Sequence, residues 1–101
     1  MSNRIDFDAV NAAALRMLPA LCARWLPGGK IVGREYVARN PKRSDKKPGS
    51  FSVNVKTGRW ADFSTGEKGG DPVSLAAFLF DLSQGDAAER LAEMLNLREA
   101  R

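Results

Sequence analysis

The residues most suited to chemistry form a basic cluster near the middle of the chain. Five cations fall within nine positions, with Asp45 as the acidic residue among them: Arg39, Lys42, Arg43, Lys46 and Lys47. Closely spaced cations neutralise phosphates and release the counterions around a polyanion, which favours binding to nucleic acid. The cluster therefore predicts a phosphate-binding surface. The alternative is an ordinary solvated loop.

Further cations and two aromatic rings could extend such a surface. Aromatic side chains beside Lys or Arg suit single-stranded nucleic acid, because bases stack on the rings while the cations hold the phosphates. Trp60 follows a cation directly, and Tyr36 precedes the cluster. The alternative for Trp60 is burial in the core of a hairpin. The additional cations, which could share one end of a sheet, are Arg34, Lys56, Arg59 and Lys68.

The net charge of +4 is distributed unevenly along the 101 residues. Residues 30–68 contain ten Lys or Arg and four Asp or Glu, whereas residues 69–101 contain three basic and six acidic residues. A basic middle followed by an acidic end favours one charged working face that binds phosphate.

Several kinds of active site are excluded by composition. The chain has no His and one Cys, Cys22. Zinc sites of the usual type need several Cys or His ligands, and the usual Ser or Cys nucleophile needs a His base. Lys68 in the Gly-rich segment 66–71 is not followed by Ser or Thr, so this segment does not match a phosphate-binding P-loop. We expect no catalysis, no metal and no cofactor. Cys22 lies in an apolar helical pattern and should be a buried thiol.

The length predicts a single domain over residues 1–101. No apolar run approaches the roughly 18–20 residues of a membrane span, and the N-terminus lacks the apolar stretch of a signal peptide. A single cysteine agrees with a reducing compartment. We therefore expect a cytoplasmic protein with no membrane partner.

Helical patterns occur at both ends of the chain. Residues 6–25 show apolar side chains at intervals of three and four, and Pro19 should break this helix near Leu18. Asp71 followed by Pro72 is a strong helix start, and Ser83 begins a second helix. The predicted N-terminal helical segment covers residues 1–29, and the two C-terminal helices cover residues 71–97.

Strand patterns occupy the middle of the chain. Residues 50–55 alternate between apolar and polar side chains, and residues 31–38 and 59–63 are the other two expected strands. Gly58 suits the tight turn between 50–55 and 59–63. In residues 59–63, Trp60 faces opposite to Arg59 and Phe63. We predict an α+β domain in which three antiparallel strands and the basic loop (30–63) pack against an N-terminal helix and two C-terminal helices.

Five segments of the chain, in order, resemble one known family. In its pattern, Cys-Pro-x-His precedes a charged Pro-Ser-Phe-x-Val strand, a strand ending in Cys-Phe-x-Cys-Gly, a Gly-Asp helix start and a helix with an Ala-x-x-Leu-Ala face. The matching segments are residues 40–43, 45–53, 59–66, 70–75 and 87–97. The chain thus resembles the zinc-ribbon domain of bacterial and phage DNA primases, including the N-terminal segments of primase–helicases.

The metal ligands of that pattern are all replaced here. Their positions are occupied by Asn40, Arg43, Asp62 and Thr65, which offer no thiolate or imidazole, so a degenerate, metal-free ribbon is expected. Short polar side chains at the two facing turns could instead hydrogen-bond to each other or to turn amides. Asp62 could also pair with Arg43.

The resemblance implies a role in phage- or plasmid-type DNA replication. Our leading hypothesis is a non-catalytic module that binds template DNA, expected to be single-stranded, for a primase or helicase activity located elsewhere in the same or another protein. The alternative is a stand-alone adaptor or inhibitor that binds a replication or defence protein. The sequence leaves open the choice of DNA or RNA, and whether a longer protein continues beyond these residues.

Overall fold

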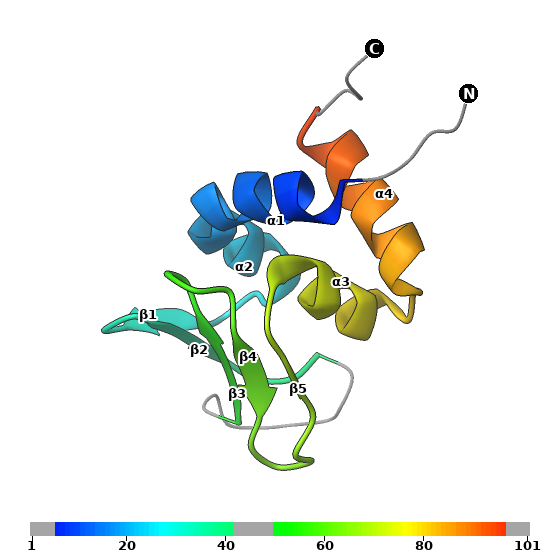
Figure 1. Ribbon diagram of the computed structural model, residues 1–101. Coiled ribbons are helices and arrows are strands. Elements are labelled where there is room, and N and C mark those ends of the chain that lie inside the picture. The colour runs from blue at the N-terminus through cyan, green and yellow to red at the C-terminus, as the bar shows by residue number, and fades with distance from the viewer. Residues whose placement is uncertain (1–5, 42–49, 97–101) are drawn as a thin grey trace, which may run out of the picture.

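A computed structural model describes residues 6–41 and 50–96, where it shows four helices and five strands (Figure 1). The sheet and the helices form two adjoining parts of the molecule. The elements are α1 (Phe7–Arg16), α2 (Leu18–Trp25), β1 (Lys30–Val32), β2 (Glu35–Ala38), β3 (Phe51–Asn54), β4 (Trp60–Asp62), β5 (Lys68–Gly69), α3 (Pro72–Phe80) and α4 (Gln84–Met94).

The N-terminal helical segment is divided as the position of its proline predicts. Asp6 caps α1 by accepting a hydrogen bond from the amide of Ala9. The helix ends at Met17, and α2 follows with Pro19 in its first turn, where the missing amide hydrogen costs nothing. Two helices therefore replace one long one in residues 6–25.

The predicted number of strands was wrong, because the sheet has five antiparallel strands in the order β1-β2-β3-β4-β5. Gly33 has a φ of +63° and turns the predicted strand 31–38 back on itself, so this segment forms the β1–β2 hairpin. The other missed strand is β5, which lies between the predicted strand 59–63 and the helix start at Asp71 and pairs with β4 over two residues.

The face of the sheet that packs against the helices carries an aromatic cluster. Tyr36, Val53 and Trp60 are neighbours in one row across β2, β3 and β4. The ring of Phe78 in α3 lies 4.8 Å from that of Trp60 and 5.9 Å from that of Phe51. Buried Trp and Tyr require partners for their polar tips. Trp60 donates to the hydroxyl of Ser74 at 2.9 Å, so the sheet is fixed to α3 by stacking and by a hydrogen bond.

The start of α3 lies where the sequence predicts it. The Asp71 carboxylate accepts a hydrogen bond from the amide of Ser74, and the Ser74 hydroxyl completes the capping box. Ser83 caps α4 in a similar way. Asn11 of α1 accepts a hydrogen bond from the amide of Val73, which ties the first helix to the third. None of the described helices is long and apolar enough to cross a membrane.

Gly69 allows β5 to pass directly over the aromatic cluster. A Cβ at this position would lie 2.5 Å from the Ser74 hydroxyl and would also collide with the indole nitrogen of Trp60. The neighbouring Gly70 has open space around it. We expect Gly69→Ala to lower the free energy of unfolding by about 1–3 kcal/mol through overpacking. Gly70→Ala is the matched control and should change it by less than about 0.5 kcal/mol. Equal effects of the two substitutions in urea denaturation would contradict this packing.

Cys22 is fully buried in α2, and burial raises the pKa of its thiol from 9.0 to about 12. The reactive thiolate is therefore scarce in the folded protein at any pH below about 12, whereas in the unfolded chain it forms from about pH 9 upward. We expect a thiol reagent at about pH 8 to modify Cys22 only after denaturation. Rapid modification of the folded protein would show that α2 opens or packs differently.

Candidate nucleic-acid interface

One end of the sheet is closed by a buried hydrogen bond between two side chains. The side-chain amide of Asn40, just after β2, donates to a carboxylate oxygen of Asp62, the last residue of β4, at 2.6 Å. Asn40 is 2% exposed and Asp62 is 0% exposed. We call these two residues the polar clasp. It joins two turns that are 22 positions apart in the sequence, as the facing polar positions predicted.

The clasp also shapes the turn between β4 and β5. The second carboxylate oxygen of Asp62 accepts a hydrogen bond from the amide of Ser64 at 2.8 Å. The backbone of Asp62 bonds to Gly66 and Glu67, and Gly66 has a φ of +84°. The Asp62 side chain thus holds its own turn after β4 through Ser64 and the segment after β2 through Asn40. It therefore fixes the ends of both strands.

The residues at the positions that match the ligands of the primase pattern do not fit a zinc ion. Both carboxylate oxygens of Asp62 accept hydrogen bonds from protein groups, and Asn40 directs its amide nitrogen, a donor, toward Asp62. Thr65 is exposed, and its hydroxyl accepts a hydrogen bond from the amide of Glu67. In residues 6–41 and 50–96, no group of three or more His, Cys, Asp or Glu could hold a metal ion. The predicted pairing of Asp62 with Arg43 falls outside the described residues.

The sheet has a second face, directed away from the aromatic cluster, which we call the outer sheet face. Successive side chains of a strand point to opposite faces, so the register identifies its members. One row crosses all five strands, from Lys30 in β1 through Val37, Ser52 and Ala61 to Lys68 in β5. Lysines therefore stand on both edges of this row.

An exposed aromatic ring lies on this face beside cations. Phe63 is 72% exposed, the most exposed of the large hydrophobic side chains described. Its amide donates to the carbonyl oxygen of Ser50, which continues the pairing of β3 with β4 by one residue. Phe63, Ala61 and the exposed Arg59 line a shallow hollow of about 270 Å³ over β2, β3 and β4. A flat ring on the same face as a guanidinium suits a single strand, because a base can stack on the ring while the cation holds a nearby phosphate.

Other polar side chains around this hollow are committed to the structure. The carboxylate of Glu35 accepts a hydrogen bond from the Ser52 hydroxyl across β2 and β3. Asn54 accepts hydrogen bonds from the amides of Lys56 and Thr57, and so shapes the β3–β4 turn. Since these groups already have partners, Phe63 and Arg59 are the better candidates for direct contact with a ligand.

The predicted cations do not all share one end of the sheet. Arg34 and Lys56 lie in the β1–β2 and β3–β4 turns, and Arg59 lies beside them at the start of β4. Lys68 lies in the edge strand β5 opposite Ala61, the middle residue of β4, and Arg39 follows β2 at the opposite end of the strands. All five are exposed. The remaining four predicted cations, Lys42, Arg43, Lys46 and Lys47, lie outside the described residues.

The predicted stacking role of Trp60 needs correction. Trp60 is 5% exposed and packs between Phe51 and Phe78, so a base cannot stack on it without opening the core. Tyr36 is also buried, and its hydroxyl donates to the carbonyl oxygen of Leu26. The ring that is exposed, Phe63, was missed. The signal was present in the alternation, which places Phe63 opposite to Trp60 and on the same face as Arg59.

The fold is similar to that of a solved primase structure. The structure is the "Crystal Structure of the Aquifex aeolicus primase (Zinc Binding and RNA Polymerase Domains)", with a TM-score of 0.72 and 23% sequence identity. The match covers 99% of this chain and 23% of that chain. A scan of protein-family models and a search of curated proteins found no match. The likeness supports a fold of the primase zinc-ribbon type, as the sequence resemblance predicts. At this identity it concerns the fold alone.

The polar clasp generates a stability prediction. Asp62→Ala removes the acceptor of the buried Asn40 amide and of the Ser64 amide. Leaving the buried Asn40 donor without this acceptor costs about 1–3 kcal/mol and loss of the bond from exposed Ser64 about 0.5–1.5 kcal/mol, so we expect the free energy of unfolding to fall by about 1.5–4.5 kcal/mol. Thr65→Ala, at an exposed position in the same turn that matches a ligand of the primase pattern, is the control and should have an effect below about 0.5 kcal/mol. Urea denaturation followed by tryptophan fluorescence measures both; comparable losses would contradict the role of the clasp.

Proposed function

We propose that this chain is a non-catalytic module that binds single-stranded nucleic acid, expected to be DNA, on the outer sheet face. The observation that carries the proposal is the exposed ring of Phe63 on a sheet face that also carries Arg59 and Lys68. A solvent-exposed Phe costs hydrophobic free energy that an ordinary surface position avoids. A ligand that covers the ring would recover it.

Each group has a distinct part in the proposed contact. A base stacks on Phe63, an interaction that contributes about 1–3 kcal/mol and tolerates any base, because every base has a flat face. Arg59 and Lys68, which both lie toward the start of β4 from Phe63, neutralise phosphates on one side of the stacked base. The polar clasp holds the β2 and β4 ends in place, so the surface is formed before the ligand arrives.

The cellular role that fits this activity is engagement of template DNA for a primase or helicase, in the same chain or in a separate protein. Similarity to a primase fold and the positive charge of residues 30–68 support it. Because the chain spans 23% of the length of the matched primase, any polymerising activity belongs to other parts of such a protein. A phage or plasmid setting and a cytoplasmic location are part of the proposal.

Substitution of the exposed ring tests the proposal. We expect Phe63→Ala to weaken binding of a fluorescein-labelled single-stranded oligonucleotide by about 5- to 150-fold, the equivalent of 1–3 kcal/mol of lost stacking. Fluorescence anisotropy at about 50 mM salt measures the dissociation constant. Phe7→Ala is the matched control, because Phe7 is 41% exposed on α1, and should leave the affinity unchanged. Equal losses for the two variants would refute the assignment of Phe63.

Salt dependence tests the phosphate contacts separately. The double variant Arg59→Gln, Lys68→Gln should reduce the slope of log affinity against log salt by about 1.4, since each phosphate contact to a single strand contributes about 0.7. An unchanged slope would exclude these two cations. If no oligonucleotide binds at about 50 mM salt while a replication protein does, the adaptor hypothesis replaces this one.

A further inference from the structure

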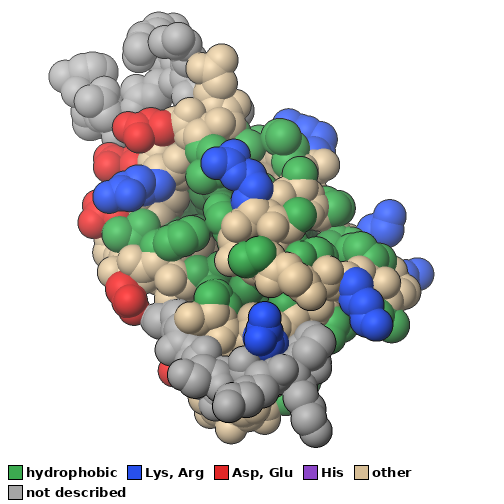
Figure 2. Space-filling view, turned by 180° about the vertical axis from the view of Figure 1, so that it is seen from behind, with side chains coloured by type: hydrophobic (Ala, Val, Ile, Leu, Met, Phe, Trp, Pro, Cys, Tyr) green, Lys and Arg blue, Asp and Glu red, His purple; other side chains and the backbone are tan. Residues whose placement is uncertain are grey.

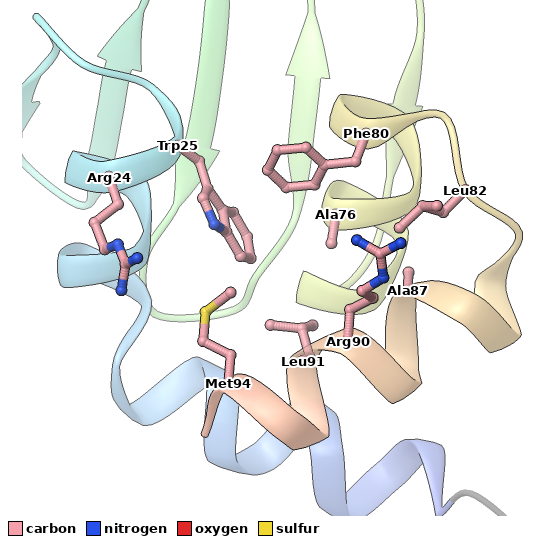
Figure 3. A pocket seen from close by; sticks show the side chains of 9 residues that line it. All are labelled: Arg24, Trp25, Ala76, Phe80, Leu82, Ala87, Arg90, Leu91 and Met94. Carbon is pink, nitrogen blue, oxygen red and sulfur yellow. The ribbon is translucent and has the colours of Figure 1, made fainter. Parts of the chain in front are cut away.

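A second hollow, of about 580 Å³, lies among α2, α3 and α4 (Figure 3). Its lining is mainly apolar, and Figure 3 shows Trp25 and Phe80 facing each other across from Met94 and Leu91. Phe80 is 48% exposed and Met94 is 42% exposed, so the hollow is open to solvent along one side. We call it the helical groove. It is formed by elements other than those that carry the outer sheet face.

The groove has a rigid wall and an adaptable rim. The rings of Trp25 and Phe80 meet edge to face at 5.6 Å, which fixes the wall formed by α2 and α3. Leu91 is 1% exposed and belongs to the core beneath. Small side chains at Ala76 and Ala87 leave the space between α3 and α4. The unbranched side chain of Met94 at the rim can adjust to the shape of a ligand.

Two arginines flank the apolar side chains of the groove. Figure 3 shows Arg24 on α2 and Arg90 on α4 on opposite sides of them. Across the described parts of the chain, neither guanidinium has an ion pair or hydrogen bond to a side chain. Asp86 and Glu93 lie four positions before and three positions after Arg90, so they share its side of α4, but within the described residues no ion pair joins either of them to Arg90. Figure 2 shows Asp and Glu gathered along one edge, with a Lys or Arg side chain among them, and hydrophobic side chains and other Lys or Arg over the middle.

We propose that the helical groove docks an acidic amphipathic segment of a partner protein. Two or three large apolar side chains of the segment fill the space between Trp25, Phe80 and Met94, and its carboxylates reach Arg24 and Arg90. An open groove between helices suits a peptide laid along it. The two guanidiniums supply charge complementarity and orientation for an acidic segment. Nucleic acid is disfavoured, because the apolar lining offers few partners for the polar edges of bases.

The two tryptophans provide the readout. Trp25 lines the groove, whereas the indole of Trp60 is buried and bonded to Ser74. The full chain is used to select binders from a displayed library of random peptides, and the variant Arg24→Gln, Arg90→Gln removes peptides that do not need the arginines. The selected peptides are then titrated into the ¹⁵N-labelled chain. We expect the selected peptides to combine Leu, Phe, Trp or Met with Asp or Glu. On titration, the indole NMR signal of Trp25 should move and that of Trp60 should not.

Point variants complete the test. Arg24→Gln and Arg90→Gln should each weaken the selected peptide about 2- to 5-fold, as expected for partly exposed ion pairs. Met94→Asp, at the exposed rim, should weaken it about tenfold by repulsion and lost apolar contact. Arg16→Gln on α1 is the matched control and should have no effect. Phe63→Ala should leave peptide binding intact, which separates this site from the proposed oligonucleotide surface.

Three results would overturn the proposal. One is selection of peptides without acidic residues, or of peptides that leave the Trp25 signal unmoved. Another is a Trp25 signal that shifts with protein concentration alone, which would identify a second copy of this chain as the occupant. The third is displacement of the bound peptide by a single-stranded oligonucleotide that itself moves the Trp25 signal, which would make the groove part of a nucleic-acid surface.

Discussion

The hydrogen bond between the side chains of Asn40 and Asp62 is the contact on which the rest of the sheet depends. It lies where β2 and β4 end, and it draws together turns that the sequence separates by 22 positions. A carboxylate buried without partners would cost several kcal/mol. Here both of its oxygens accept hydrogen bonds, one from Asn40 and one from the amide of Ser64. Within the described residues, no buried side-chain nitrogen or oxygen lacks a partner.

The clasp alone cannot replace the free energy that a structural zinc ion would supply. A buried, charge-assisted hydrogen bond contributes about 1.5–3 kcal/mol, whereas zinc binding to a small domain is worth about 10–16 kcal/mol. The remainder must come from burial of apolar surface. The stacked rings of Phe51, Trp60 and Phe78 join the sheet to α3, and α1 is tied to α3 through Asn11. The clasp therefore sets the geometry of the strand ends while the helical core supplies the stability.

Local chemistry made much of this fold predictable. Pro19 marks the break between α1 and α2, because a proline cannot continue a helix. Asp71 followed by Pro72 marks the start of α3, because the first residue caps the helix and the second suits its first turn. The facing polar turns followed from the family pattern. The β1–β2 hairpin was missed because Gly33, which allows its turn, lies in a continuous strand-like pattern. β5 was missed because a strand of two residues is too short to show an alternating pattern. Its pairing depends on β4, which lies beside it in the folded sheet.

The candidate sites were also predictable only in part. Alternation in β4 placed Trp60 and Phe63 on opposite faces, but it could not say which face meets the helices, since that depends on contacts with α3. The helical groove had no sequence signal, because Ala76 and Ala87 leave a hollow only once α3 and α4 pack together. Residue propensity and spacing thus identify helices and strands, whereas the surface hollows depend on the packing of elements that are distant in the sequence.

We infer that the fold is held without a metal ion, because the polar clasp sets the strand ends and the helical core supplies the stability. The most direct test is the free energy of unfolding of the whole chain, measured in urea with excess chelator and again with added zinc. We expect the same free energy of unfolding in both conditions and no zinc retained after dialysis. A substantial loss of stability with chelator, or zinc bound in a one-to-one ratio, would contradict this inference.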